Sequence, residues 1–130
     1  MRHLIFVAAL IAATPALAQD TSPDRLVAAY TAESGRAADA AAGRTLFMAQ
    51  NNGGKPDTPS CTTCHTDTPR ASGQSRTGKT IDPLAPSGNP ERFTDTKKVE
   101  KWFGRNCNSV LGRECTAAEK ADIVAWLASL

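Results

Sequence analysis

The chain has 130 residues, of which 15 are basic and 13 are acidic, so its formal net charge at pH 7 is only +2. This length suffices for one small domain, and the sequence shows no basic patch of the kind that binds nucleic acid. Apolar residues make up 41% of the chain, a modest share for so short a sequence, so a buried apolar ligand would supply part of the core.

Residues 1–18 have the pattern of a secretory signal peptide. Arg2 supplies a positive charge, residues 4–13 form an uncharged apolar stretch, and Ala16-Leu17-Ala18 matches a small-x-small cleavage site. The apolar stretch is too short to span a membrane, and no later segment is long enough to do so. We therefore expect residues 19–130 to form a single domain of a bacterial periplasmic protein. An uncleaved N-terminal anchor is the alternative.

Two helices are expected before residue 60. Ser22 and Pro23 favour a helix start, because proline is tolerated at the first helical position, and Gly35 is expected to end this helix. A second, alanine-rich helix is predicted over residues 37–50, where the sequence Asn-Asn-Gly-Gly stops it. Gly43 and Phe47 lie four residues apart and therefore share a face of this helix.

The rest of the chain is expected to hold a long loop and two further helices. Residues 66–92 are rich in Pro, Gly, Ser and Thr and show no helical or strand period. A third helix is predicted from Thr94 to about Arg105. A capping box at residues 116–119 opens the last helix. The apolar residues at helical spacing in these two helices are Val99, Trp102, Phe103, Ile123, Trp126, Leu127 and Leu130. The predicted fold class is all-α.

The segment Cys61-Thr62-Thr63-Cys64-His65 is a c-type haem attachment sequence. Two thiols three residues apart can each bond a haem vinyl group, and the imidazole of the next residue can then bind the iron. A thioredoxin-like redox centre would need a strand-to-helix setting, and a zinc site would need a different spacing of the remaining cysteines. We therefore expect one covalent haem c, attached through Cys61 and Cys64, with His65 as an axial ligand.

Gly43 and Phe47 before the motif, and Trp126 and Leu127 in the last helix, give the chain a resemblance to the class I cytochrome c fold. In that family the first and last helices cross closely, a glycine allows the contact, and aromatic residues pack beside it. The resemblance implies that Gly43 and Phe47 pack against Trp126 and Leu127. It also implies a small helical fold with long loops around one haem.

The usual sixth ligands of haem iron are missing from the sequence. His65 is the one histidine outside the signal peptide, and Met48 precedes the motif on a predicted helix. Class I cytochromes supply their methionine from a loop after the motif, so an ordinary His/Met electron carrier is not expected. A lysine, an oxygen donor such as asparagine, a water molecule or an open site remains.

Residues 101–115 are the best candidates for the distal wall of the haem site. They contain Cys107 and Cys115, the two cysteines that the haem does not use. In an oxidising compartment these two are expected to form a disulfide. The bridge is either a structural staple or a redox-active bond that adjusts the haem loop, and the sequence leaves both readings open.

Residues 101–115, together with residues 83–86 and 89–95, resemble the sphaeroides haem protein (SHP) family, and the similarity extends over essentially the whole mature chain. The resemblance implies a high-spin c-type cytochrome that binds oxygen. It also implies that an asparagine beside the disulfide ligates the oxidised iron. In this sequence the matching asparagine is Asn106, next to Cys107. Asn108 is the rival, because an alternating arrangement could turn either amide toward the iron.

An amide oxygen is a weak, hard donor that suits ferric iron better than ferrous iron, so we expect Asn106 to leave on reduction and free a site for O2, CO or NO. The family resemblance implies a dihaem cytochrome c and a membrane cytochrome b as electron donors. The alternative is a plain six-coordinate electron-transfer cytochrome c, with a lysine such as Lys79 or Lys97 as ligand. Reduction of O2, NO or a peroxide-like oxidant would make the protein an enzyme, which the sequence leaves open.

Overall fold

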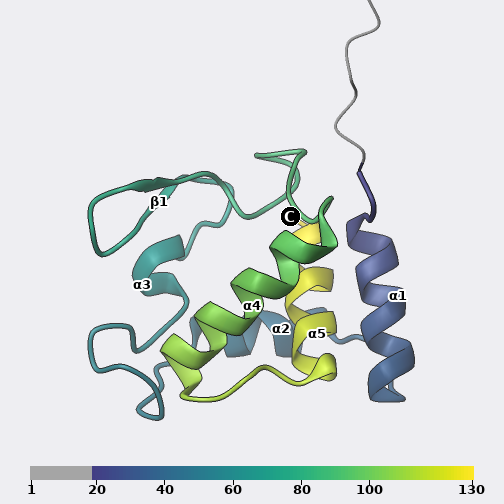
Figure 1. The fold of residues 1–130 in the computed structure, drawn as a ribbon, viewed down its shortest axis with the longest axis horizontal. Coiled ribbons are helices and arrows are strands. Elements are labelled where there is room, and N and C mark those ends of the chain that lie inside the picture. The colour runs from purple at the N-terminus through teal and green to yellow at the C-terminus, as the bar shows by residue number, and fades with distance from the viewer. Residues whose placement is uncertain (1–18) are drawn as a thin grey trace, which may run out of the picture.

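The computed structural model describes residues 19–130, so the signal peptide predicted over residues 1–18 lies outside the described residues. The fold is mostly helical, as predicted, and Figure 1 shows its elements in chain order. These are α1 (Pro23–Ser34), α2 (Ala40–Met48), α3 (Thr62–His65), β1 (Gly73–Gln74), β2 (Thr80–Ile81), α4 (Thr96–Leu111) and α5 (Ala117–Ala128). Within residues 19–130, no helix is both long and apolar enough to cross a membrane.

Both predicted ends of the first helix and the predicted start of the last helix are confirmed. The Ser22 side chain accepts a hydrogen bond from the Arg25 backbone N–H, and Gly35 ends α1 in the left-handed conformation with φ 72°. The capping box at the start of α5 is complete. The Thr116 hydroxyl accepts from the Glu119 backbone N–H, and the Glu119 carboxylate accepts from the Thr116 backbone N–H. The second helix begins at Ala40 rather than near residue 37, because Asp39 is extended and caps the N–H groups of α2.

The prediction that the third helix ends near Arg105 was wrong. The helix α4 continues to Leu111, and Gly112 ends it with φ 70°. The added turns place Cys107 and Val110 on the buried side of α4, in line with Val99. Much of the predicted distal wall is therefore helical rather than a loop between helices.

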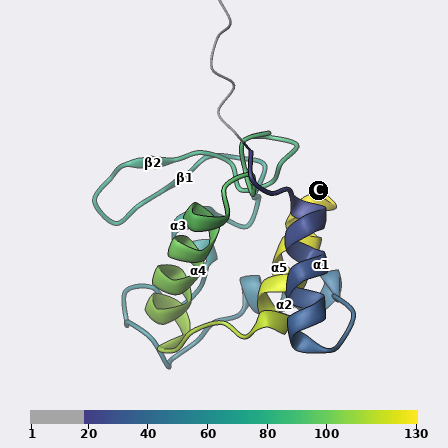
Figure 2. The ribbon, with the colours of Figure 1, turned by 45° about the vertical axis from the view of Figure 1, so that its right-hand side comes forward.

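The helix α5 packs closely against both α1 and α2, and the two contacts organise two apolar clusters. The first cluster, between α1, α4 and α5, contains Leu26, Tyr30, Val99, Ala121 and Val124. The second, between α2 and α5, contains Phe47, Ile123, Trp126 and Leu127. In both views, α3 and the paired strands β1 and β2 lie on the side of the molecule away from α1 (Figure 1, Figure 2).

The long segment 66–92 was predicted to lack strands, but it contains a small antiparallel pairing. Gly73 is opposite Ile81 and Gln74 is opposite Thr80. A Cβ atom on Gly73 would lie only 2.0 Å from the carbonyl oxygen of Cys64, so β1 runs directly against α3. A ladder of two residues is too short to give an alternating sequence pattern, which is why the sequence did not indicate it.

Candidate haem site

The haem attachment motif forms a single helical turn that is tied to α2. The backbone N–H groups of Cys64 and His65 both donate to the carbonyl oxygen of Cys61, at 3.3 and 3.1 Å. The Ser60 side chain is only 2% exposed, and its hydroxyl donates to the carbonyl oxygen of Phe47 at 3.3 Å. Ser60 Oγ also accepts a bond from the Thr62 hydroxyl at 2.9 Å. The motif therefore packs against the second apolar cluster.

His65 lies against this cluster through the ring of Phe47. Their ring centroids are 6.2 Å apart, and Phe47 in turn lies 5.1 Å from the ring of Trp126. Burial of the imidazole, together with the nearby charge of Arg92, lowers the pKa of His65 to about 4. The imidazole is therefore neutral at physiological pH and keeps the lone pair that an iron ligand needs. Within the described residues, its buried Nδ1 has no hydrogen-bond partner.

Among the described residues, Cys61 and Cys64 are unpaired thiols, and both are partly buried. Burial is the main reason that the pKa of Cys61 is raised to about 11, and Cys61 packs against the cluster around Trp126. A thiol with so high a pKa is protonated at neutral pH and is a poor redox nucleophile. The protonated Cys61 thiol, the second unpaired thiol at Cys64 and a neutral, buried imidazole with an unpaired nitrogen fit a covalent haem.

Arg92 is a candidate site residue that the sequence analysis did not select. Its Nε donates to the carbonyl oxygen of Pro83 at 2.7 Å, and its Nη2 donates to that of Asp82 at 2.6 Å. The guanidinium is half-buried, and burial lowers the pKa of Arg92. It lies close enough to His65 to lower the pKa of the imidazole. Arg92 lies far from His65 along the chain and belongs to no motif, so no local sequence signal identifies it.

The structure separates the two rival asparagines of α4. Asn108 is exposed, and its side-chain amide donates to the carbonyl oxygen of Gly104 at 2.7 Å, so it is bonded to its own helix. Asn106 is half-buried and lies three and four residues from Phe103 and Val110, on the buried side of the helix. Because successive helical residues turn by about 100°, Asn106 and Asn108 point in nearly opposite directions.

Comparisons with known proteins identify the family of the chain. Residues 33–127 match a family model described as a domain of unknown function, DUF1924. The chain is 62% identical over 128 residues to the cytochrome c-type protein SHP of Cereibacter sphaeroides, which covers 98% of both proteins. It is 36% identical to cytochrome c'' of Methylophilus methylotrophus, over 98% of the chain and 93% of that protein.

The chain belongs to the SHP family of c-type cytochromes.

Solved structures agree with this membership. The structure of oxidised SHP, described as an oxygen-binding cytochrome c, matches with a TM-score of 0.84 and 62% identity, over 85% of the chain and 99% of that structure. The crystal structure of oxidised cytochrome c'' from Methylophilus methylotrophus matches with a TM-score of 0.68 and 38% identity, over 82% and 93%. The SHP family membership confirms the predicted helical fold and the predicted cofactor, one covalently bound haem c.

This member of the SHP family has the predicted disulfide between Cys107 and Cys115. The two sulfur atoms are bonded, the Cα atoms are 5.6 Å apart, and both residues are buried. Cys107 directly follows Asn106 in α4, and Cys115 directly precedes the N-cap of α5. The bridge therefore fixes the C-terminal part of α4 to the start of α5.

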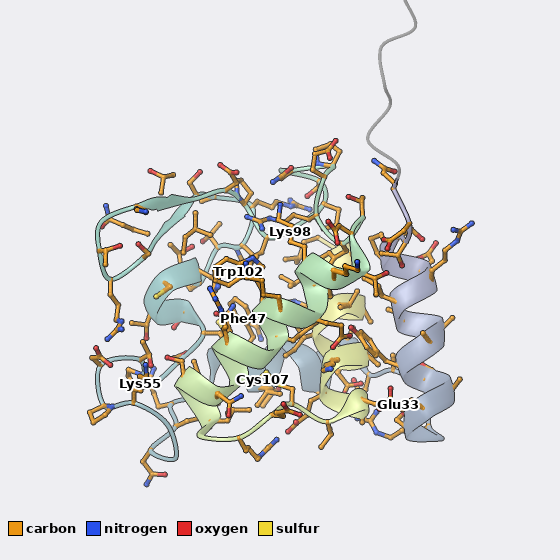
Figure 3. The ribbon with its side chains drawn as sticks, in the orientation of Figure 1. Glu33, Phe47, Lys55, Lys98, Trp102 and Cys107 are labelled. Atoms are coloured by element: carbon orange, nitrogen blue, oxygen red, sulfur yellow. A yellow bond between two sulfur atoms is a disulfide. The ribbon has the colours of Figure 1, made fainter. Side chains whose placement is uncertain are left out.

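Trp102 lies on the same side of α4 as Asn106, between the ribbons of α3 and α4 in Figure 3. Its ring is 44% exposed, and the cations of Lys101 and Arg105 lie 5.9 and 5.5 Å from the ring centroid. Arg113 lies outside this group and binds Glu119 through two hydrogen bonds of 2.8 and 2.7 Å, so its charge is already paired.

Met48 lies at the end of α2, where its side chain packs against the second apolar cluster. The expectation that it is not an iron ligand stays a prediction. Its contact with the core gives Met48 a structural role that does not require the iron.

Proposed function

We propose that this chain is a periplasmic monohaem c-type cytochrome whose reduced form binds a diatomic ligand. Cys61 and Cys64 attach the haem covalently, and His65 provides the axial imidazole. Asn106 provides the distal ligand in the oxidised state. When bound, the haem supplies one-electron exchange between ferric and ferrous iron and a coordination site for O2, CO or NO.

His65 and Asn106 have different roles in the proposed haem site. His65 is held neutral by burial, so that its lone pair is available without a competing proton. Asn106 offers an uncharged amide oxygen, a donor that is retained better by ferric than by ferrous iron. The Asn106 oxygen would be held less well by the reduced iron, and the amide N–H groups would then be available to donate to a diatomic ligand.

The position of Asn106 on the buried side of α4 is the observation that carries this proposal. Lys97, a candidate ligand of the plain electron carrier, is exposed and lies nine residues before Asn106, about half a turn away around the helix axis. Lys79 is exposed near the turn between β1 and β2. The oxygen-binding description of the related SHP structure supports the same function.

Location and partners follow from the same proposal. The signal peptide predicted over residues 1–18 would deliver the protein to the periplasm, where a dihaem cytochrome c and a membrane cytochrome b are the proposed electron donors. Lys97, Lys98 and Lys101 are exposed on α4 and form a basic surface that would attract an acidic redox partner. This attraction weakens as the ionic strength rises.

Substitution of the two asparagines tests the ligand assignment. Asn106→Val removes the amide from the buried side of α4, whereas Asn108→Val makes the same chemical change on the exposed side. We expect Asn106→Val to raise the affinity of the ferric form for imidazole at least tenfold, because no internal ligand then competes. Asn108→Val should leave it within about twofold of the wild type. Equal effects of the two substitutions would refute the assignment.

A further inference from the structure

The loop over residues 49–61, which joins α2 to the haem motif, crosses the C-terminal turns of α4 in direct backbone contact. A Cβ atom on Gly54 would lie 2.2 Å from the carbonyl oxygen of Ser109. One on Gly53 would lie 2.6 Å from the carbonyl oxygen of Leu111. Only residues without a side chain allow this approach. The two glycines therefore bring the segment that leads into the motif against the helix that carries Asn106.

Thr58 and Ser109 hold the crossing together. Thr58 is 5% exposed, and its hydroxyl donates to the carbonyl oxygen of Ser109 at 3.0 Å and lies 2.8 Å from the Ser109 hydroxyl. The backbone N–H of Lys55 donates to the same carbonyl oxygen at 2.7 Å. This carbonyl lies in the last turn of α4, where carbonyl groups lack partners within the helix. The loop therefore caps α4 and is fixed to it.

The positions of these two residues connect the two sides of the haem site. Thr58 lies three residues before Cys61, the first residue of the motif. Ser109 lies three residues after Asn106, so the two share a face of α4 one turn apart. The hydroxyl pair is thus a direct link between the covalent attachment side and the turn that carries the proposed distal ligand.

We propose that Thr58 and Ser109 are positioning residues that set the distance and orientation of Asn106 relative to the haem motif, an inference that rests on the proposed function. Their hydrogen bonds hold the last turns of α4 where the Asn106 amide reaches the oxidised iron. Without them, this turn can move relative to the motif. Asn106 then competes less well with an added ligand.

Other contacts keep α4 folded when this link is removed, so the inference can be tested in a folded protein. Near its start, Glu100 accepts hydrogen bonds from the Tyr30 hydroxyl and from Lys120 Nζ, which join α4 to α1 and α5. Near its end, the disulfide from Cys107 remains. The hydroxyl pair is therefore a local adjustment of the site and not the main support of the helix.

The test measures imidazole affinity of the ferric, haem-loaded protein after removal of the Thr58 hydroxyl. Thr58→Val is expected to raise this affinity about five- to tenfold, whereas Thr58→Ser keeps the hydroxyl and should stay within about twofold of the wild type. Thr45→Val is the matched control, because among residues 19–130 the Thr45 hydroxyl bonds only to the carbonyl oxygen of Ala41 in α2, at 2.9 Å. Ser109→Ala removes the hydroxyl pair but keeps the bond from Thr58 to the Ser109 carbonyl oxygen, so it should raise the affinity less, by about threefold. It replaces Thr58→Val if that variant yields no haem-loaded protein.

A double substitution separates positioning from a general loss of stability. In an Asn106→Val background, Thr58→Val should not change the imidazole affinity further, because the group it positions is gone. The same rise with and without Asn106 would overturn the inference, as would an unchanged affinity in Thr58→Val. If Asn106→Val itself has no effect, the proposed function fails and the inference fails with it. If Asn106→Val raises the imidazole affinity but neither Thr58→Val nor Ser109→Ala does, only the inference is refuted and the proposed function stands.

Discussion

The backbone of Gly43 in α2 meets the backbone of Asp122 in α5. A Cβ atom on Gly43 would lie 2.1 Å from the carbonyl oxygen of Asp122 and 2.7 Å from the backbone nitrogen of Ile123. Both neighbours are backbone atoms of a buried helix, so they cannot turn aside as a side chain would. The contact lies one helical turn from Phe47, whose ring centroid is 6.2 Å from that of His65.

Gly43→Ala should therefore destabilise the protein by about 2–3 kcal/mol, because the methyl group forces α2 and α5 apart. Gly104→Ala is the matched control. A Cβ atom there meets nothing within 4 Å, and alanine is the better helix former, so stability should stay equal or rise by about 0.5–1 kcal/mol. Thermal unfolding of both haem-loaded variants checks this. A Gly43→Ala protein as stable as the wild type would contradict the close crossing.

Acid should destabilise the contact between α2 and α5, because it protonates the Asp122 carboxylate. Burial alone would raise the pKa of Asp122, but hydrogen bonds from Arg36 and from the Asp39 backbone N–H, with the charge of Arg36, lower it overall. Because the pKa is lower in the folded state, the carboxylate stabilises the fold above about pH 4, and this stabilisation is lost as the pH falls further.

Asp122→Asn should lower the melting temperature at pH 7 by about 5 °C and flatten its dependence on pH below about pH 4. The measurement is the melting temperature from pH 2.5 to pH 7. Glu33→Gln, an exposed change of the same charge, serves as the control and should preserve the wild-type profile. An Asp122→Asn protein with the full acid sensitivity of the wild type would show that this carboxylate does not contribute.

Removal of the disulfide should lower stability without detaching the haem. The bridge closes a short loop, with a sequence separation of 8. In the chain-entropy treatment such a loop contributes about 2.5 kcal/mol. A Cys107→Ala, Cys115→Ala double variant should unfold at a lower denaturant midpoint by the corresponding amount. A midpoint equal to that of the oxidised wild type would rule out a structural staple and favour the redox-active reading.

Haem attachment should depend on the other two cysteines. Replacement of both Cys61 and Cys64 by alanine should let acidified acetone extract the haem, because no thioether bond then remains. The Cys107→Ala, Cys115→Ala variant is the control and should keep its haem through the same extraction. Haem retained by the Cys61→Ala, Cys64→Ala protein would contradict the assignment of the attachment residues.

The local features of the fold were predictable from sequence, and the long-range ones were not. Ser22, Gly35 and the capping box at Thr116 each depend on residues only a few positions away. Their patterns therefore predicted both ends of α1 and the start of α5 correctly. The prediction for α4 is wrong because it stops the helix near Arg105, although Gly112 is the left-handed residue that ends it.

That error also explains why Asn106 and Asn108 could not be separated from sequence. In an extended segment the two would point the same way, whereas in a helix they diverge by about 200°. The contact between Thr58 and Ser109 joins residues 51 positions apart, and neither hydroxyl belongs to a motif. Arg92, which lies close to His65, is hidden from sequence for the same reason.

Optical spectra of the purified holoprotein test the central claim most directly. They are recorded for the oxidised protein, for the reduced protein, and for the reduced protein under carbon monoxide. Release of Asn106 on reduction predicts a high-spin ferrous spectrum that shifts at once when carbon monoxide is added. A sharp low-spin ferrous spectrum that ignores carbon monoxide would mean that a sixth ligand is held firmly. The protein would then be a plain six-coordinate electron carrier, and the ligand-binding function proposed for it would be wrong.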